Sequence, residues 1–188
     1  MIKGKMTDLI KDATGNKFKD RTINLHIENA WNTVVGQLFK SDPSSFDLYV
    51  KSYTIPVTPS KPRPYITLPV RTIETNDTAN GVRRIFYADD DDLSFVPIPA
   101  SGAQFYSLLN LDTIDDSIGY LVKSQIVEFW NMPSIVKEVR VEIVPAWDEY
   151  ADTDDIPLPS GVANLIIQQA VATLSNQSVE TNIYKPKK

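Results

Sequence analysis

Two acidic segments contain the residue types that could do chemistry in this chain. The first is the run Asp89–Asp92 in YADDDDLSFVP, and the second comprises Asp148, Glu149, Asp152, Asp154 and Asp155. Carboxylates can bind a divalent cation, and a pair of them can act as general acid and base, as in glycoside hydrolysis. A carboxylate- or metal-dependent hydrolase is therefore one hypothesis for this sequence.

The spacing of the first run argues against a metal site. In an extended chain, consecutive side chains point to opposite faces, so Asp89–Asp92 cannot all reach one ion. The spaced ligands, turn glycine and distal glutamate of an EF-hand loop do not follow either. Apolar, strand-like segments flank the run, and Asp tolerates turn conformations. We therefore interpret the run as a solvated hairpin turn.

The second acidic segment and the single histidine also have structural interpretations. Asp154 and Asp155 precede a helix that starts with proline, where negative charge interacts favourably with the helix dipole. His26 lies in a helical segment, off its apolar stripe, so we expect it to be exposed or to cap the helix. The sequence contains no P-loop, nucleophile elbow, dinucleotide fingerprint or zinc-protease motif. We expect no catalytic residue, no metal and no cofactor.

Composition indicates an ordinary globular chain. The 188 residues are 42% hydrophobic and 23% charged, with a net charge of −5. No excess of positive charge draws the chain to nucleic acid, and the absence of cysteine excludes disulfides and zinc–thiolate sites. No apolar run has the length of a membrane span, and the first residues lack the apolar core of a signal peptide. We expect a protein of the cytoplasm, or one released from it, with no membrane partner.

The predicted fold class is α+β. Apolar residues recur at three- and four-residue spacings in residues 20–41 and again in residues 159–175, which predicts two amphipathic helices packed against each other. A large antiparallel β-rich insertion, residues 45–147, lies between them. The predicted organisation is an N-terminal arm (1–19), a single domain (20–177) and a C-terminal tail (178–188).

Several strands are predicted within the insertion. Three prolines confine KPRPYITLPV to an edge strand, and IGYLVKSQIVEFW predicts a hairpin that turns at Lys123-Ser124. KEVRVEIVPAW alternates, with Val139, Val141 and Ile143 on the buried face. Residues 102–111 suggest a short helix. The aromatic residues Trp31, Trp130 and Trp147 are interpreted as core, the last two at a packed sheet edge.

The order of the segments between about residues 20 and 180 resembles one known family. These segments are AWNTVVGQLF, YVKSYTIPV, YITLPVRTI, GVRRIFY, FVPI, IGYLVKSQIVEFW and VRVEIVPAWDEYADTDDIPLPSGVANLIIQQAVATL. The most characteristic pieces are TLP before a GVR strand, and TDDIPLPSGV at the start of the last helix. Together they are similar to the head-to-tail connector proteins of tailed bacteriophages, also called adaptor or ring proteins, of the crAss-like short-tailed type.

This resemblance implies a structural role in the virion. A homo-oligomeric ring, usually of twelve copies, would sit beneath the portal protein at one capsid vertex and dock the tail or neighbouring ring proteins. DNA would pass through its channel without specific binding, and twelve copies at −5 each would give the ring a formal charge of −60. The chain would be in the host cytoplasm during assembly. No catalytic motif belongs to the family.

The resemblance also implies a partner-binding segment. C-terminal tails of such proteins commonly reach into the portal, which makes NIYKPKK the matching segment here. Its candidate contacts are Ile183, Tyr184, Lys185, Lys187 and Lys188. The large β-rich middle departs from the simplest all-helical adaptors. Another virion or capsid accessory module, which would bind without forming a ring, stays open as an alternative.

Overall fold

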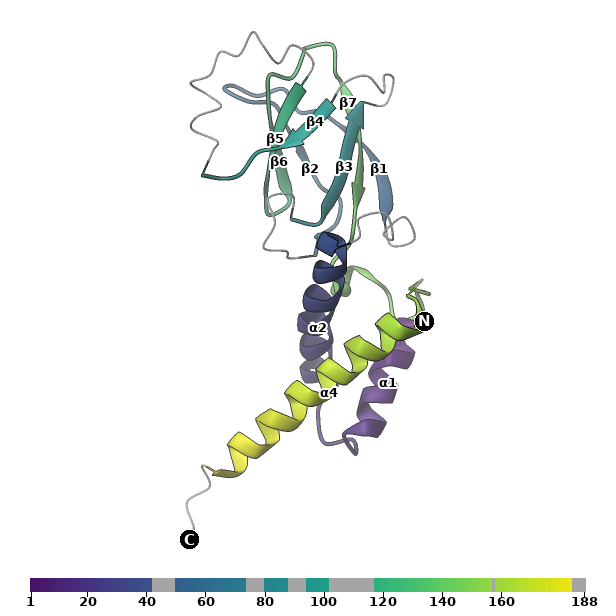
Figure 1. The fold of residues 1–188 in the computed structure, drawn as a ribbon. Helices are drawn as coiled ribbons and strands as arrows, with labels where there is room; N and C mark the ends of the chain where they lie inside the picture. The colour runs from purple at the N-terminus through teal and green to yellow at the C-terminus, as the bar shows by residue number, and fades with distance from the viewer. Residues whose placement is uncertain (42–49, 74–79, 88–93, 102–116, 157, 184–188) are drawn as a thin grey trace. The chain divides into compact units, whose positions relative to one another are not determined.

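The chain divides into two compact units in the computed structural model (Figure 1). Residues Met1–Tyr49 and Ala146–Lys188 form the helical unit, and Val50–Pro145 form the β unit. The structure describes residues 1–41, 50–73, 80–87, 94–101, 117–156 and 158–183. Helices from both ends of the chain flank a β-rich middle, which confirms the predicted α+β class. The grouping of the units into a single domain stays a prediction.

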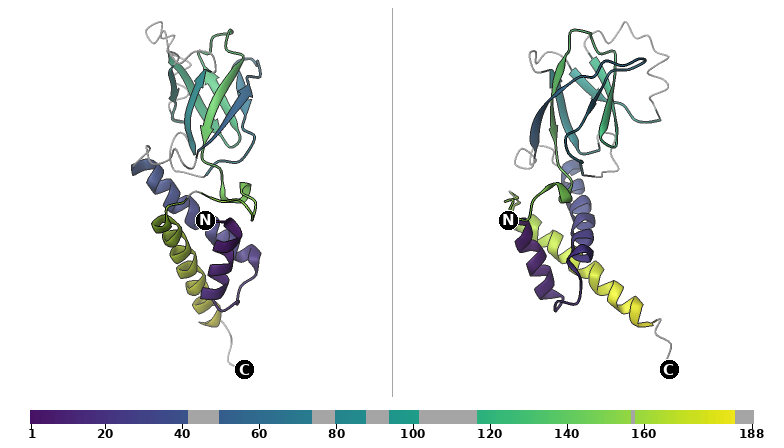
Figure 2. Two further views of the ribbon diagram at one scale, coloured as in Figure 1. Left: turned by 90° about the vertical axis from the view of Figure 1, so that its right-hand side faces the viewer. Right: turned by 180° about the vertical axis from the view of Figure 1, so that it is seen from behind.

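The helical unit contains three α-helices and a short 3-10 helix in its described part. These are α1 (Lys3–Ala13), α2 (Asp20–Ser41), η2 (Trp147–Glu149) and α4 (Ser160–Ile183). Helices α2 and α4 lie side by side, and α1 contacts both (Figure 2). The apolar stripe predicted in residues 20–41 lies on α2 and is buried inside the helical unit. Its fully covered members include Ile23, Ile27, Trp31 and Val35.

Helix α1 occupies the segment that the sequence suggested was an arm. One face of it is buried, at Lys3, Met6, Thr7 and Ile10. Met6 and Ile10 are fully covered, and this spacing of four residues puts them on the same side of the helix. The sequence indicates only one possible helical turn here, around Met6, Leu9 and Ile10. Helix α1 is longer than that turn, and it depends on packing against α2 and α4.

Helix α4 is longer than expected. It begins at Ser160, and Pro159 accepts its first hydrogen bond, from the Ala163 amide. The prediction of its C-terminal end was wrong, because residues 178–183 continue the helix instead of starting the tail. No glycine or proline interrupts the sequence between residues 162 and 185, so nothing in it stops the helix at residue 175.

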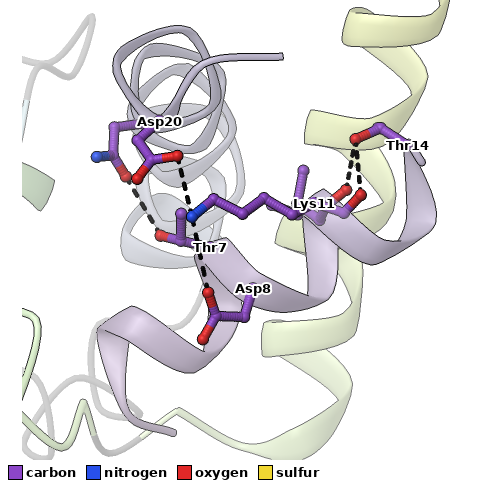
Figure 3. A network of polar contacts seen from close by, with 7 residues as sticks. Thr7, Asp8, Lys11, Thr14 and Asp20 are labelled. Atoms are coloured by element: carbon purple, nitrogen blue, oxygen red, sulfur yellow. Dashed lines mark hydrogen bonds and ion pairs between the residues drawn. The ribbon is translucent and has the colours of Figure 1, made fainter. Parts of the chain in front are cut away.

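A polar network ties α1 to the start of α2 (Figure 3). The Lys11 ammonium group lies 2.9 Å from a carboxylate oxygen of Asp20 and 3.9 Å from one of Asp8. Thr7 donates a hydrogen bond of 3.3 Å to Asn24 in the same contact. The hydrogen bond to Asp20 is the main reason that the pKa of Lys11 is raised above its ordinary value of 10.5.

This network gives a prediction about alkaline pH. Asp20→Asn should lower the pKa of Lys11 toward its ordinary value, which NMR titration of the lysine side chains would measure. Because the folded-state pKa is raised, the pair stabilises the fold below pH 10.5 and loses this effect as the pH rises through the folded pKa. Asp8→Asn, the matched control, should shift the pKa less. An equal shift in both variants would contradict the assignment.

The β unit is a sandwich of two sheets. Its strands are β1 (Lys51–Pro56), β2 (Tyr65–Thr67), β3 (Val82–Tyr87), β4 (Ser94–Pro97), β5 (Ser117–Lys123), β6 (Ile126–Trp130) and β7 (Glu138–Ile143). One sheet has the order β1-β7-β3 and the other β2-β6-β5-β4. Among the described strands, every pair is antiparallel except β4 with β5, which is parallel. One apolar cluster fills the space between the sheets, with residues such as Ile66, Phe129 and Val141.

The strand predictions agree well with this unit. Strand β2 lies at a sheet edge, as its flanking prolines required. Strands β5 and β6 form the expected hairpin, in which Lys123 is the last paired residue and Ser124 has a positive φ of 56°. Strand β7 is central, and Val139, Val141 and Ile143 are fully buried. The predicted helix at 102–111 lies outside the described residues.

Candidate functional site

Asp154 and Asp155 of the second acidic segment interact with nearby groups. The Ala151 amide donates a 2.9 Å hydrogen bond to Asp154, and the amino group of Met1 lies 2.7 Å from Asp155. Backbone bonds from Lys3 and Gly4 to the same segment fix it beside α1. In the part of the chain that is described, no three His, Cys, Asp or Glu side chains converge on a point where an ion could sit. The run Asp89–Asp92 lies outside that part.

A buried lysine and two tryptophans form the centre of the helical unit. The rings of Trp31 and Trp147 are 5.6 Å apart, and Tyr150 packs edge-on against Trp31 at 5.8 Å. Lys3 is only 7% exposed. Its ammonium group donates a 2.5 Å hydrogen bond to the Tyr150 carbonyl and lies 5.4 Å from the Trp147 ring centre.

The prediction that a packed sheet edge explains Trp147 was wrong, since Trp147 belongs to η2 and its ring packs against Trp31 of α2. Lys3 was missed because one lysine in a polar segment carries no signal.

His26 is buried, contrary to the expectation of an exposed or capping residue. Its side chain is 7% exposed, and its Nδ1 lies 2.9 Å from the hydroxyl oxygen of Thr173 on α4. The Thr173 hydroxyl also has the carbonyls of Gln169 and Ala170 within reach. A hydroxyl has one hydrogen, so the arrangement that satisfies most groups has Thr173 donating to a helix carbonyl and accepting from Nδ1–H. The sequence could not show this, because the partner of His26 is 147 residues away.

The His26–Thr173 contact gives a second prediction. Thr173→Val should destabilise the helical unit by about 0.5–1.5 kcal/mol, because it removes a part-buried hydrogen bond between α2 and α4. Chemical denaturation followed by far-UV circular dichroism would measure the loss. Thr173→Ser, which keeps the hydroxyl, should retain most of the stability. If the serine and valine variants were equally destabilised, the hydrogen bond would not be the cause.

An uncharged groove runs between α2 and α4. Its volume is about 460 Å³, and its lining consists of His26, Asn29, Ala30, Thr33, Gln169, Thr173 and Asn176. Amide, hydroxyl and imidazole groups provide both donors and acceptors, but no formal charge faces the groove from these residues. Such a lining can hold an uncharged polar partner but offers no electrostatic attraction for an ion or a phosphate.

The sequence segments on both sides of the groove also lack charged residues. Residues 156–179 contain no Asp, Glu, Lys or Arg, and neither do residues 29–39 of α2. At the chain's average of 23% charged residues, the first of these segments would carry about five charges. This signal is visible in the sequence, but sequence reasoning missed it because the apolar stripe of the last helix accounted for the segment.

The β unit carries a charged cluster on its second sheet. Arg63 lies over the ring of Trp130 at 4.1 Å and 3.7 Å from a carboxylate oxygen of Glu128. Lys123 donates to both oxygens of Glu128 at 2.9 Å. Glu128 thus holds the proline-rich segment before β2 against the β5–β6 hairpin. Arg63 and Lys123 both pair with Glu128 at a partly exposed site. Holding these segments together is sufficient to explain the cluster, without a ligand.

A small apolar hollow of about 250 Å³ lies beside the same proline-rich segment. Its lining includes Val57, Pro59, Met132 and Pro133, and the neighbouring Ile135 is 70% exposed. An exposed apolar side chain next to a hollow is a feature of contact surfaces. Nothing in the described residues indicates what would cover this one.

The predicted partner-binding segment is only partly described. Ile183 is the last residue of α4, and its side chain is not among those described; Tyr184, Lys185, Lys187 and Lys188 lie outside the described residues. Their role therefore stays a prediction. None of the helices within the described ranges is long and apolar enough to cross a lipid bilayer. The chain matches no protein-family model, and no curated protein matches its sequence.

Proposed function

We propose that the protein is a structural subunit of a head-to-tail connector ring of a tailed bacteriophage. The observation that carries the proposal is a resemblance in sequence: the segments between about residues 20 and 180, and their order along the chain, resemble those of the connector family. In this proposal the ring sits beneath the portal protein, extends the DNA channel and docks the tail. The subunit performs no reaction.

The described structure supports this proposal in two ways. The segments that carry the resemblance contain α2, the strands β1 to β7 and α4, and its most characteristic pieces, TLP and TDDIPLPSGV, lie mainly in the connections after β2 and before α4. The helical unit also has a groove lined by uncharged residues, in a chain whose net charge is −5. A subunit of a permanent assembly needs such a surface, because the centres of protein interfaces are depleted of charged residues.

The hydrolase alternative requires the two acidic segments to converge. Asp154 and Asp155 already interact with a loop amide and an amino group of their own unit. Replacement of Asp90 and Asp91 by Asn, with loss of a measured hydrolytic activity, would favour the alternative over the connector.

Electron microscopy of assembled particles tests the proposal most directly. Density that fits this chain should occur as a closed ring at the single portal vertex, and the purified chain should form a closed oligomer alone or with the portal protein. Native mass spectrometry would count its copies. Density elsewhere on the particle would favour an accessory module, and a strictly monomeric chain that does not bind the portal would contradict the proposal.

A further inference from the structure

The turn before β3 contains the single Asn-Gly pair of the sequence. Asn80 is followed by Gly81, whereas every other asparagine precedes a residue that has a side chain. An asparagine side chain reacts most readily with the next backbone nitrogen when that nitrogen belongs to glycine, because no side chain shields it. Whether the reaction occurs in the folded chain depends on the backbone conformation of the turn.

The reaction in question is deamidation, and it needs only water. The backbone nitrogen of Gly81 attacks the side-chain carbonyl carbon of Asn80 and forms a bond to it. The side-chain nitrogen leaves as ammonia with the proton given up by the Gly81 nitrogen, and a five-membered succinimide ring remains. Water then opens the ring at either carbonyl, which gives aspartate or isoaspartate.

The conformation of Asn80 opposes this attack. Ring closure requires the Gly81 nitrogen and the Cβ atom of Asn80 to lie on the same side of the bond between Cα and the carbonyl carbon. Asn80 has a φ of 42°, which places it in the left-handed region, where ψ is about +30 to +60°. At such a ψ the Gly81 nitrogen points away from Cβ. The peptide between Asn80 and Gly81 must therefore turn over before the ring can form.

Hydrogen bonds from two other segments hold that peptide in place. The hydroxyl group of Thr72, a residue that is only 7% exposed, donates a 2.7 Å hydrogen bond to the Asn80 carbonyl oxygen. This oxygen belongs to the same peptide group as the Gly81 nitrogen, so the bond resists the rotation directly. The Val144 amide donates a 3.0 Å hydrogen bond to the next carbonyl oxygen, that of Gly81, and the Ile73 amide donates one of the same length to Val144.

We infer that Asn80 is a deamidation site, which the folded β unit keeps unreactive through Thr72 and which reacts when the turn opens. The product carries a new carboxylate in the turn. Isoaspartate also adds a methylene to the main chain, which displaces Gly81 from Val144 and loosens the start of β3. Because the reaction is irreversible, the modified fraction records how often the turn has opened. This inference does not depend on the connector proposal.

Peptide mass spectrometry of the full chain, incubated in mildly alkaline buffer with and without urea, tests the inference. In urea, Asn80 should deamidate faster than every other asparagine. In the folded chain its rate should fall at least about tenfold, because only the open fraction of the turn reacts. Asn131 is an internal reference: its φ is 58°, but Met132 follows it, so it should stay intact under both conditions. Equal rates at Asn80 with and without urea would overturn the inference, and so would an unreactive Asn80 in urea.

Thr72→Val tests the hydrogen bond that holds the turn. This variant keeps the shape of the side chain and removes the hydroxyl donor, so it should speed up deamidation of the folded chain several-fold and leave the rate in urea unchanged. Thr67→Val is the matched control, because Thr67 is an exposed threonine of β2. It should change neither rate. An unchanged folded-state rate in Thr72→Val would show that Thr72 does not hold the site unreactive.

Low concentrations of urea separate opening of the turn from unfolding of the whole unit. Sensitivity to urea scales with the surface that is exposed, so a local opening should give a nearly constant rate below the unfolding transition. A rate that rises steeply over this range would assign the reaction to global unfolding and contradict a local gate. Gly81→Ala, compared with the natural sequence in urea, should slow the reaction without any contribution from folding.

Discussion

Trp31→Ala is expected to destabilise the helical unit by about 3–5 kcal/mol. Trp31 is fully buried on α2, and its ring contacts the rings of both Trp147 and Tyr150. Removal of the indole leaves a cavity between α2 and the η2 segment. The chain that follows η2 is held against α1 by the Lys3 bond to Tyr150 and by the backbone bonds of residues 152 and 154, so it cannot easily collapse into the cavity. Since small domains have only about 5–15 kcal/mol of stability, much of the unit's stability would be lost.

Hydrogen exchange resolved by peptide would measure this effect. Amides in α2 and α4 should exchange much faster in Trp31→Ala than in the natural sequence. Trp31→Phe is the matched control, because it keeps an aromatic ring in the same place and should lose less than half as much stability. Unchanged protection of α4 in the alanine variant would show that the tryptophan pair does not hold the helices together.

Gly81→Ala is expected to destabilise the β unit by about 2–5 kcal/mol, the sum of about 1–2 kcal/mol of backbone strain and about 1–3 kcal/mol of overpacking. Gly81 precedes β3 with a φ of 77°, in the left-handed region that side chains disfavour. A Cβ atom there would lie 2.8 Å from the Ile73 carbonyl oxygen and 2.9 Å from the Cβ of Thr72. The backbone cannot move away easily, because the Val144 amide donates a 3.0 Å hydrogen bond to the Gly81 carbonyl.

Gly15→Ala is the matched control for this change. Gly15 has a φ of 64°, but the nearest atom to a Cβ there is the flexible end of Lys17, at 4.0 Å. This variant therefore has the strain without the clash and should lose about 1–2 kcal/mol. Urea denaturation of both variants would compare them. Equal losses would show that the close approach of Ile73 and Thr72 contributes nothing.

Local patterns in the sequence predicted most of the described strands and the first long helix. The alternation in β7 and the prolines around β2 each act within a few residues, so they indicate a strand and its position without knowledge of the partners. The apolar spacing in residues 20–41 matched α2 to its ends. The length of α4 was missed, because the apolar stripe ended before the helix did.

The sequence showed only part of the uncharged surface of α4. The long uncharged run from residue 156 to residue 179 is in the sequence, but a sequence cannot show which side of α4 is already covered. That distinction needs the buried positions of α4, from Ala163 to Leu174, and the exposure of Leu165.

The sequence by itself determined the α+β class, the alternation of β7 and the span of α2, because periodicity is a property of neighbouring residues. Only the tertiary structure decided that His26 is buried against Thr173, that Trp147 packs on Trp31, and that Lys3 and the helix α1 belong to the core. Each of these contacts joins residues more than one hundred positions apart or depends on faces supplied by other helices. Burial is set by what covers a side chain, and the covering groups come from distant parts of the chain.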